Sequence, residues 1–496
     1  MKKKLFNIKF VTKDDVPISH SLRIVQIICI LIGCFTILGL LLGAFNYDIA
    51  TFIWKNILIP GKGLFFYLSQ VFTFKILGFR GGLFYLLVLF IIILMITDGI
   101  VLDSKSITKK ERNAICNSIR MITYPLLTLE LVIVFGFGYM SYNNPKMDTL
   151  YFKEESNKTY TEKDLIQLNQ YLENKVIEYS HMMERDDNGN IIHDSLIDIA
   201  ISDLRKASKN YDILKGLYPR KLYHFDDYDR SHDPTLYGLT TIDSVGVSFD
   251  QEAPALLNTI THELCHTKEI VRENEATLCS IIVGLESDNK LSQYAAYMEA
   301  YGRSVDAIYL IDKNIANESI HNFQTLCTTN HYKEICNWSS KNTTLYVKKS
   351  DMIAISTFSL NTYEEGFIIN FLESLKDYSP KLYMDDKKIS KEKLTNYLNT
   401  DKRVTIMIKN SKDIFKKISP YLDENKDKFS QIAQMYPHMY KGVDLDREEA
   451  IKYYTSSIPN SNIFSFFSGD LMELFDYSRV VRLVLEYFDY KNIGYY

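Results

Sequence analysis

Long uncharged apolar runs are confined to the first part of the chain, and the rest has the mixed pattern of a water-soluble protein. The first run covers 24–45 and is long enough to cross a bilayer core of about 30 Å. A second, shorter run covers 83–97, and the neutral residues beside it can extend it. A third covers 121–140 and contains Pro125 and Glu130, which a membrane tolerates only where they face protein or water. The pattern predicts three transmembrane helices.

Lysines and arginines are dense in 1–23 and in the loop 99–120, and sparser in 46–82. Because cytoplasmic loops carry the excess of positive charge, the N-terminus and the second loop are predicted to be cytoplasmic. Three spans then place everything after about residue 142 on the extracytoplasmic side of a multi-pass cell-membrane protein, with the lipid bilayer as a partner. A cleaved signal peptide is the alternative for the first run, but the run is too long and no small-residue cleavage site ends it.

Beyond the third run, the periodicity is mainly that of helices. Thr161 and Asp164 have the spacing of a helix N-cap before the periodic run 165–176, and a second amphipathic helix is predicted over 197–211. The alternation in 245–249, weakened by a glycine, predicts an edge strand.

The pattern of apolar and polar residues changes between 350 and 449. It predicts a small α/β insertion, with strands over 352–360 and 403–408 and a helix over 364–375. The fold class is therefore mostly α, of the α+β kind. The expected organisation is a cytoplasmic N-terminus (1–23), a membrane domain with three transmembrane helices (24–141), a main soluble domain (142–349), the insertion (350–449) and C-terminal helices that complete the main domain (450–496).

Composition narrows the functional classes only slightly. The net charge of -4 and the lack of a basic stripe in the soluble part give no reason to expect a nucleic-acid partner. The seven cysteines are too scattered for a disulfide framework, so mostly free, buried thiols are expected, although Cys327 and Cys336 could pair in an oxidising compartment.

The strongest chemical signal is His262-Glu263-Leu264-Cys265-His266, in a helix predicted over 255–268 with Pro254 at its start. Histidines at i and i+4 project from one face of a helix, so two imidazoles can bind one zinc ion at about 2.0–2.1 Å. Glu263 is expected to orient and deprotonate the attacking water rather than to bind the metal. The alternative is a helix with two surface histidines, but the apolar neighbours indicate burial, and burying these polar groups together is costly unless something satisfies them.

A catalytic zinc needs a third protein ligand, and Glu273 and Glu275 follow closely. Glu273 shares a helix face with small or polar residues, whereas Glu275 shares one with apolar residues, so Glu273 is the favoured ligand and Glu275 the alternative. A straight helix from His266 would carry Glu273 about 10 Å along its axis. The chain must therefore turn between them, near 269–271, although no glycine is present there.

The residues 261–266, followed by Arg272-Glu273-Asn274-Glu275-Ala276, resemble a bacterial family of HExxH membrane proteins known as domain-of-unknown-function family 3810. The resemblance implies three N-terminal spans followed by a zincin-like domain. The Glu-x-x-Ala pattern of 273–276 is also similar to the third-ligand helix of gluzincin peptidases, which implies Glu273 as a ligand. The family usually has glycine where Glu269 stands and asparagine where Thr277 stands.

The sequence thus predicts a membrane-anchored zinc metallopeptidase with His262, His266 and Glu273 as metal ligands, Glu263 as the catalytic residue, Zn²⁺ as the cofactor and a peptide or protein as the substrate. The alternative is a catalytically silent zinc-binding scaffold or sensor of the same fold. A third possibility is a metal-free surface protein held by its anchor. Candidates for an additional oxyanion donor are Tyr477, Arg479 and His331.

Overall fold

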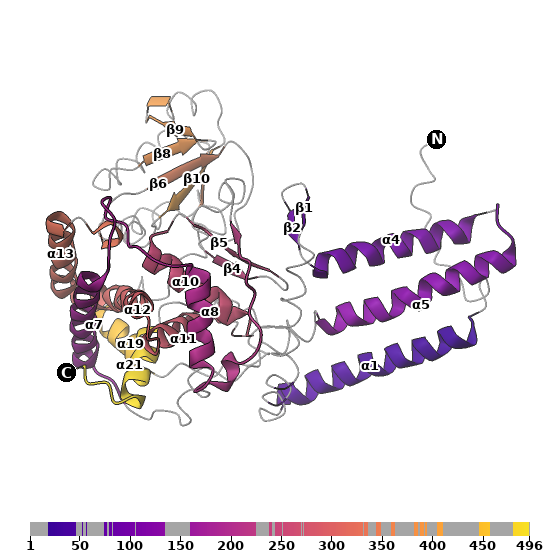
Figure 1. Cartoon of the computed structure of the whole chain (residues 1–496), viewed down its shortest axis with the longest axis horizontal. Helices are drawn as coiled ribbons and strands as arrows, with labels where there is room; N and C mark the ends of the chain where they lie inside the picture. Colours follow the sequence, from indigo (N-terminus) through magenta and orange to yellow (C-terminus); the bar gives the residue numbers. More distant parts are fainter. Residues whose placement is uncertain are drawn as a thin grey trace. The chain divides into compact units, whose positions relative to one another are not determined.

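The structure is a computed structural model of the whole chain (Figure 1). It describes residues 18–45, 74–133, 159–224, 238–335, 446–456 and 480–495, with short gaps inside these ranges, and the strands that lie between 344 and 409. The chain divides into two compact units. The first unit comprises 1–61 and 68–144, and the second comprises 62–67 and 145–496.

The first unit contains three long helices and a short hairpin. Helix α5 (Lys109–Ile133) packs against both α1 (His20–Phe45) and α4 (Leu83–Asp103). An ion pair joins α4 to α5, with 3.0 Å between the guanidinium of Arg120 and the carboxylate of Asp98. The hairpin pairs β1 (Phe74–Ile76) with β2 (Phe79–Gly81) in antiparallel register.

Two of these helices are long and apolar enough to cross a membrane, over His20–Gly39 and Leu86–Asp103. Their apolar side chains are largely exposed, which suits a lipid environment better than water. Helix α5 begins among charged residues and contains Pro125, and the end of the predicted third run, 134–140, lies outside the described residues. The third span stays a prediction.

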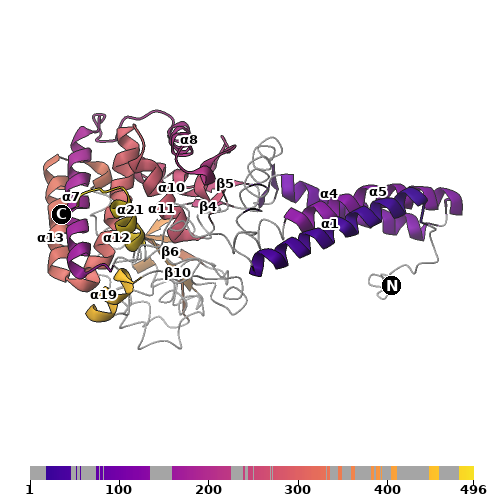
Figure 2. The same ribbon diagram turned by 90° about the horizontal axis from the view of Figure 1, so that it is seen from below.

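The second unit is built around α12 (Lys290–Ile311), which packs against several of the described helices (Figure 2). Among them are α7 (Glu162–Met182), α10 (Ala253–His266), α11 (Glu273–Leu285), α13 (Lys313–Asn330), α19 (Arg447–Thr455) and α21 (Val480–Tyr490). Helix α8 (Leu196–Ala207) covers α10 and α11. The molecule is therefore mostly helical, as the sequence predicted.

Local signals placed the first helices of this unit correctly. The N-cap predicted at Thr161 is present as a capping box, in which the Asp164 carboxylate accepts the Thr161 main-chain N–H at 2.7 Å. The second predicted helix ends at Ala207, before the end of the predicted range 197–211, and is followed by the short 3-10 helix η4 (Asp212–Leu214).

A small sheet beside α10 has the strand order β3-β5-β4, formed by β3 (Tyr223–His224), β4 (Gly238–Thr240) and β5 (Val245–Val247). The expectation of an edge strand over 245–249 is wrong, because β5 pairs with β3 on one side and β4 on the other. Among the described strands, β4 is an edge of this sheet, and it packs against α10.

A separate five-stranded sheet lies largely within the predicted insertion, with the strand order β7-β10-β6-β8-β9. Its strands are β6 (Thr344–Lys348), β7 (Ser359–Thr362), β8 (Lys381–Met384), β9 (Lys387–Ile389) and β10 (Val404–Lys409). Strand β10 matches the prediction over 403–408, and β7 overlaps the end of the one over 352–360. The predicted helix over 364–375 lies outside the described residues.

Candidate metal centre

Helix α10 carries both histidines of the motif, with His262 buried and His266 partly buried. It begins at Ala253 with Pro254 in the first turn, where a missing N–H leaves no helix partner unsatisfied. His262 and Glu263 are both buried, and the rings of His262 and His266 lie edge to face with centroids 4.7 Å apart. The helix predicted from the pattern is therefore present, with the motif inside the molecule.

The chain reverses direction after His266, as the third-ligand argument required, so that α11 returns alongside α10 (Figures 1 and 2). No described residue of the reversal has a left-handed backbone. A buried lysine fastens it instead, because Lys268 Nζ donates to the carbonyls of Lys215 at 3.1 Å and Leu217 at 2.9 Å. The same ammonium lies 3.8 Å from the Tyr218 ring centre. These contacts favour a charge that burial opposes, and burial lowers the pKa of Lys268 to about 7.

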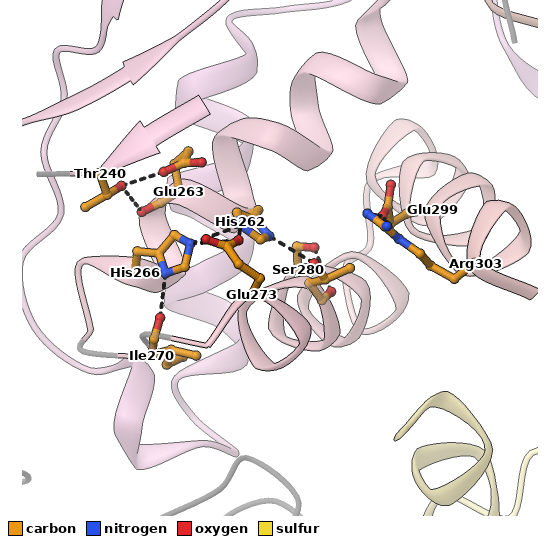
Figure 3. Close-up of polar contacts among 10 residues, drawn as sticks. Thr240, His262, Glu263, His266, Ile270, Glu273, Ser280, Glu299 and Arg303 are labelled. Atoms are coloured by element: carbon orange, nitrogen blue, oxygen red, sulfur yellow. Dashed lines mark hydrogen bonds and ion pairs between the residues drawn. The ribbon is translucent and has the colours of Figure 1, made fainter. Parts of the chain in front are cut away.

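The reversal brings three potential ligands together (Figure 3). The Nε2 atoms of His262 and His266 are 3.0 Å apart. The Glu273 carboxylate Oε2 lies 2.9 Å from His262 Nε2 and 3.5 Å from His266 Nε2. Two nitrogens and one oxygen thus converge on one point from two helices.

The remaining ring nitrogens face oxygen atoms on the outer side of the cluster. His266 Nδ1 lies 2.6 Å from the carbonyl oxygen of Ile270, which can only accept a hydrogen bond, so Nδ1 carries the proton. His262 Nδ1 lies 3.3 Å from the hydroxyl of Thr277 on α11. With protons on the two Nδ1 atoms, both Nε2 atoms offer lone pairs toward the shared centre.

The charged groups of the cluster favour positive charge at its centre. Burial alone would lower the pKa of His266, but the Glu273 carboxylate outweighs it and raises the pKa to about 9. Burial likewise opposes ionisation of Glu273, yet the two imidazoles hold the pKa of its carboxyl well below the usual range. The Glu273 carboxylate and the two imidazoles therefore stabilise positive charge where they meet.

Glu263 lies on the other side of the histidines and is held by strand β4 (Figure 3). The Thr240 hydroxyl is 2.7 Å from the Glu263 carboxylate Oε2 and 2.9 Å from the Glu263 carbonyl oxygen. Burial raises the pKa of Glu263. Ligand atoms of His262, Glu263 and His266 lie within 4.8 Å of one another, but Glu273 is the carboxylate in direct contact with both rings.

Other sequence candidates fall elsewhere. Glu275 is buried, with 3.8 Å between its carboxylate and the guanidinium of Arg272. The possible oxyanion donors Tyr477, Arg479 and His331 lie outside the described residues. Sequence reasoning missed Thr240 as a neighbour of Glu263, because a three-residue strand has no periodic signal.

A disulfide joins the two helices that carry the cluster, between Cys265 of α10 and Cys279 of α11. Both residues are fully buried. The expectation of mostly free thiols is therefore wrong for this pair, which the helix packing brings together. Of the pair considered from the sequence, Cys327 belongs to α13 and Cys336 lies outside the described residues, so this pairing stays a prediction.

Comparison with known proteins identifies the family but no characterised relative. The family described as "Protein of unknown function (DUF3810)" matches residues 62–363, more than half of the chain, and the chain belongs to it. No curated protein matches the chain, and no solved structure matches it.

Proposed function

We infer that this protein is a membrane-anchored zinc-dependent peptidase of the zincin type. The observation that carries the proposal is the convergence of His262 Nε2, His266 Nε2 and Glu273 Oε2, at separations of 2.9–3.5 Å. Zinc–nitrogen bonds of 2.0–2.1 Å at tetrahedral angles separate two ligand atoms by about 3.3 Å. The three atoms need to move by only a few tenths of an ångström to fit that geometry.

The set of donors also matches a catalytic rather than a structural zinc site. Two imidazoles and one carboxylate leave a fourth position open for water or substrate. The buried oxygens beside the Nδ1 atoms of His262 and His266 are the outer partners that zinc-binding histidines usually have. A zinc ion bound there would polarise a peptide carbonyl and acidify water.

The chain itself supplies the other parts of a hydrolytic site. Glu263 lies beside the proposed ligands and is suited to take a proton from the attacking water and pass it to the leaving amine. Burial raises the pKa of this carboxyl, which moves a general base toward neutrality. Strand β4, an edge of the small sheet, lies next to Glu263 and offers main-chain groups to an extended peptide.

The proposal places this site outside the cytoplasm, anchored by three transmembrane helices with a cytoplasmic N-terminus. Support comes from the two apolar helices α1 and α4 and from the distribution of positive charge. The Cys265–Cys279 disulfide adds independent support, because such bonds persist in oxidising compartments.

Zinc content and peptide hydrolysis test the proposal. The full chain is purified in detergent as wild type, His262→Ala, Glu263→Gln and, as a control, His193→Ala, because His193 is exposed and does not belong to the cluster. We expect about one zinc per chain in wild type, Glu263→Gln and His193→Ala, and little in His262→Ala. Casein should be cleaved by wild type and His193→Ala only. A folded wild type without zinc would refute the metal site.

The competing proposal is a silent zinc-binding scaffold or sensor. It predicts the same zinc contents, no cleavage of casein or of a peptide library, and no effect of Glu263→Gln in cells. The zincin-type peptidase hypothesis predicts that Glu263→Gln has the same cellular phenotype as a deletion of the gene.

A further inference from the structure

Strand β4 encloses the Glu263 carboxylate from two sides. The Thr240 hydroxyl lies 2.7 Å from Oε2. A methyl group added at Gly238 would lie 2.3 Å from Oε1 and 2.7 Å from the carboxyl carbon, so the glycine leaves the space that the carboxylate occupies. Both carboxylate oxygens therefore abut the same three-residue strand, which is itself held in register by β5, with Gly238 opposite Val247.

This restraint has a chemical consequence because Glu263 is close enough to compete for the metal. Its ligand atom lies within 4.8 Å of those of both histidines. A carboxylate oxygen binds zinc at about 2.0–2.2 Å, so rotation of the Glu263 side chain could bring it onto the ion. A fourth protein ligand would close the position that water or substrate needs.

We propose that Thr240 and Gly238 form a cradle that keeps Glu263 off the metal and so preserves an open coordination position. Thr240 is a positioning residue that acts through Glu263. Gly238 acts by its lack of a side chain, since any side chain there displaces the carboxylate from the strand. The proposal rests on the metal site proposed above and adds what keeps that site reactive.

Cobalt substitution tests the cradle without an activity assay. An open coordination position on Co²⁺ accepts an added anion such as azide in place of water, which changes the visible spectrum, whereas four protein ligands leave no such position. The full chain in detergent is loaded with Co²⁺ as wild type, Thr240→Val, Thr240→Ser and Gly238→Ala. We expect azide to change the spectra of wild type and Thr240→Ser. We expect severalfold weaker azide binding by Thr240→Val, which lacks the hydroxyl, and by Gly238→Ala, which crowds the carboxylate.

A second substitution separates the cradle from a general disturbance of the fold. Glu263→Gln removes the competing anion, so Thr240→Val combined with Glu263→Gln should regain the azide binding of wild type. Unchanged azide binding in Thr240→Val, or a loss that Glu263→Gln does not restore, would overturn the proposal. Absence of cobalt binding by the folded wild type would overturn the metal site and the cradle together, which distinguishes the two failures.

Discussion

Replacing Thr277 by valine removes the hydroxyl beside His262 and almost nothing else. Thr277 is buried in the first half of α11, and valine has nearly the same shape. The substitution leaves the Nδ1–H of a buried imidazole without its acceptor at 3.3 Å. Zinc binding through Nε2 requires that proton on Nδ1. Loss of the hydroxyl acceptor therefore destabilises the metal-bound state more than the metal-free state.

The geometry sets the expected size of the effect. Loss of an outer partner of a zinc-binding histidine typically weakens binding 10–100-fold. The contact of 3.3 Å is longer than a good N–H···O bond. We therefore expect Thr277→Val to weaken zinc affinity about tenfold, or about 1.4 kcal/mol.

Competition with a chromophoric chelator measures this affinity in the full chain. Thr277→Ser retains a hydroxyl, so its zinc affinity should lie within about threefold of wild type, a smaller change than that expected for Thr277→Val. Ser280→Ala removes a neighbouring buried hydroxyl that donates to the Thr277 carbonyl, and should leave the affinity unchanged. Equal affinities for Thr277→Val and Thr277→Ser, or an equal loss in Ser280→Ala, would refute the assigned role.

Three further predictions follow from contacts described above. Glu273→Gln should bind zinc far more weakly than Glu275→Gln in the same competition assay, and equal affinities would remove Glu273 from the ligand set. The Cys265–Cys279 bond joins residues 14 apart, and a loop of that size is worth about 3 kcal/mol, so guanidinium should unfold the oxidised protein at a higher concentration than the reduced protein. Burial raises the pKa of Tyr218 above its ordinary value of 10.0, so its contribution to stability is present below pH 10.0 and is lost as the pH rises above it. Guanidinium unfolding below and above pH 10.0 should show wild type losing more stability than Tyr218→Phe as the pH rises, and equal losses would contradict this assignment.

Much of the candidate site was predictable because its parts lie on strongly patterned helices. The spacing of His262 and His266 fixes their common face without any tertiary information. The distance argument also required a reversal before Glu273, and α11 does return beside α10. The contacts that hold this turn could not be predicted from the pattern. They join the buried ammonium of Lys268 to carbonyls some fifty residues earlier in the chain.

The remaining errors concern contacts between segments that are distant in sequence. The strand β5 has the alternation of an edge strand, but its parallel partner β3 comes from a two-residue segment without a signal of its own. Thr240 precedes Glu263 by 23 residues and meets it only because β4 packs on α10. The pairing of Cys265 with Cys279 likewise depends on how two helices pack, not on cysteine spacing.

The buried disulfide would report on which side of the membrane this domain folds. A reducing cytoplasm would leave Cys265 and Cys279 as thiols, whereas an extracytoplasmic fold would seal them as a bond that reagents cannot reach until the domain unfolds. Cys116, in the helix α5, has no disulfide partner and provides an internal thiol reference in the same molecule. Counting alkylated thiols after unfolding without reductant therefore reads the topology of the native, untagged protein directly from cells.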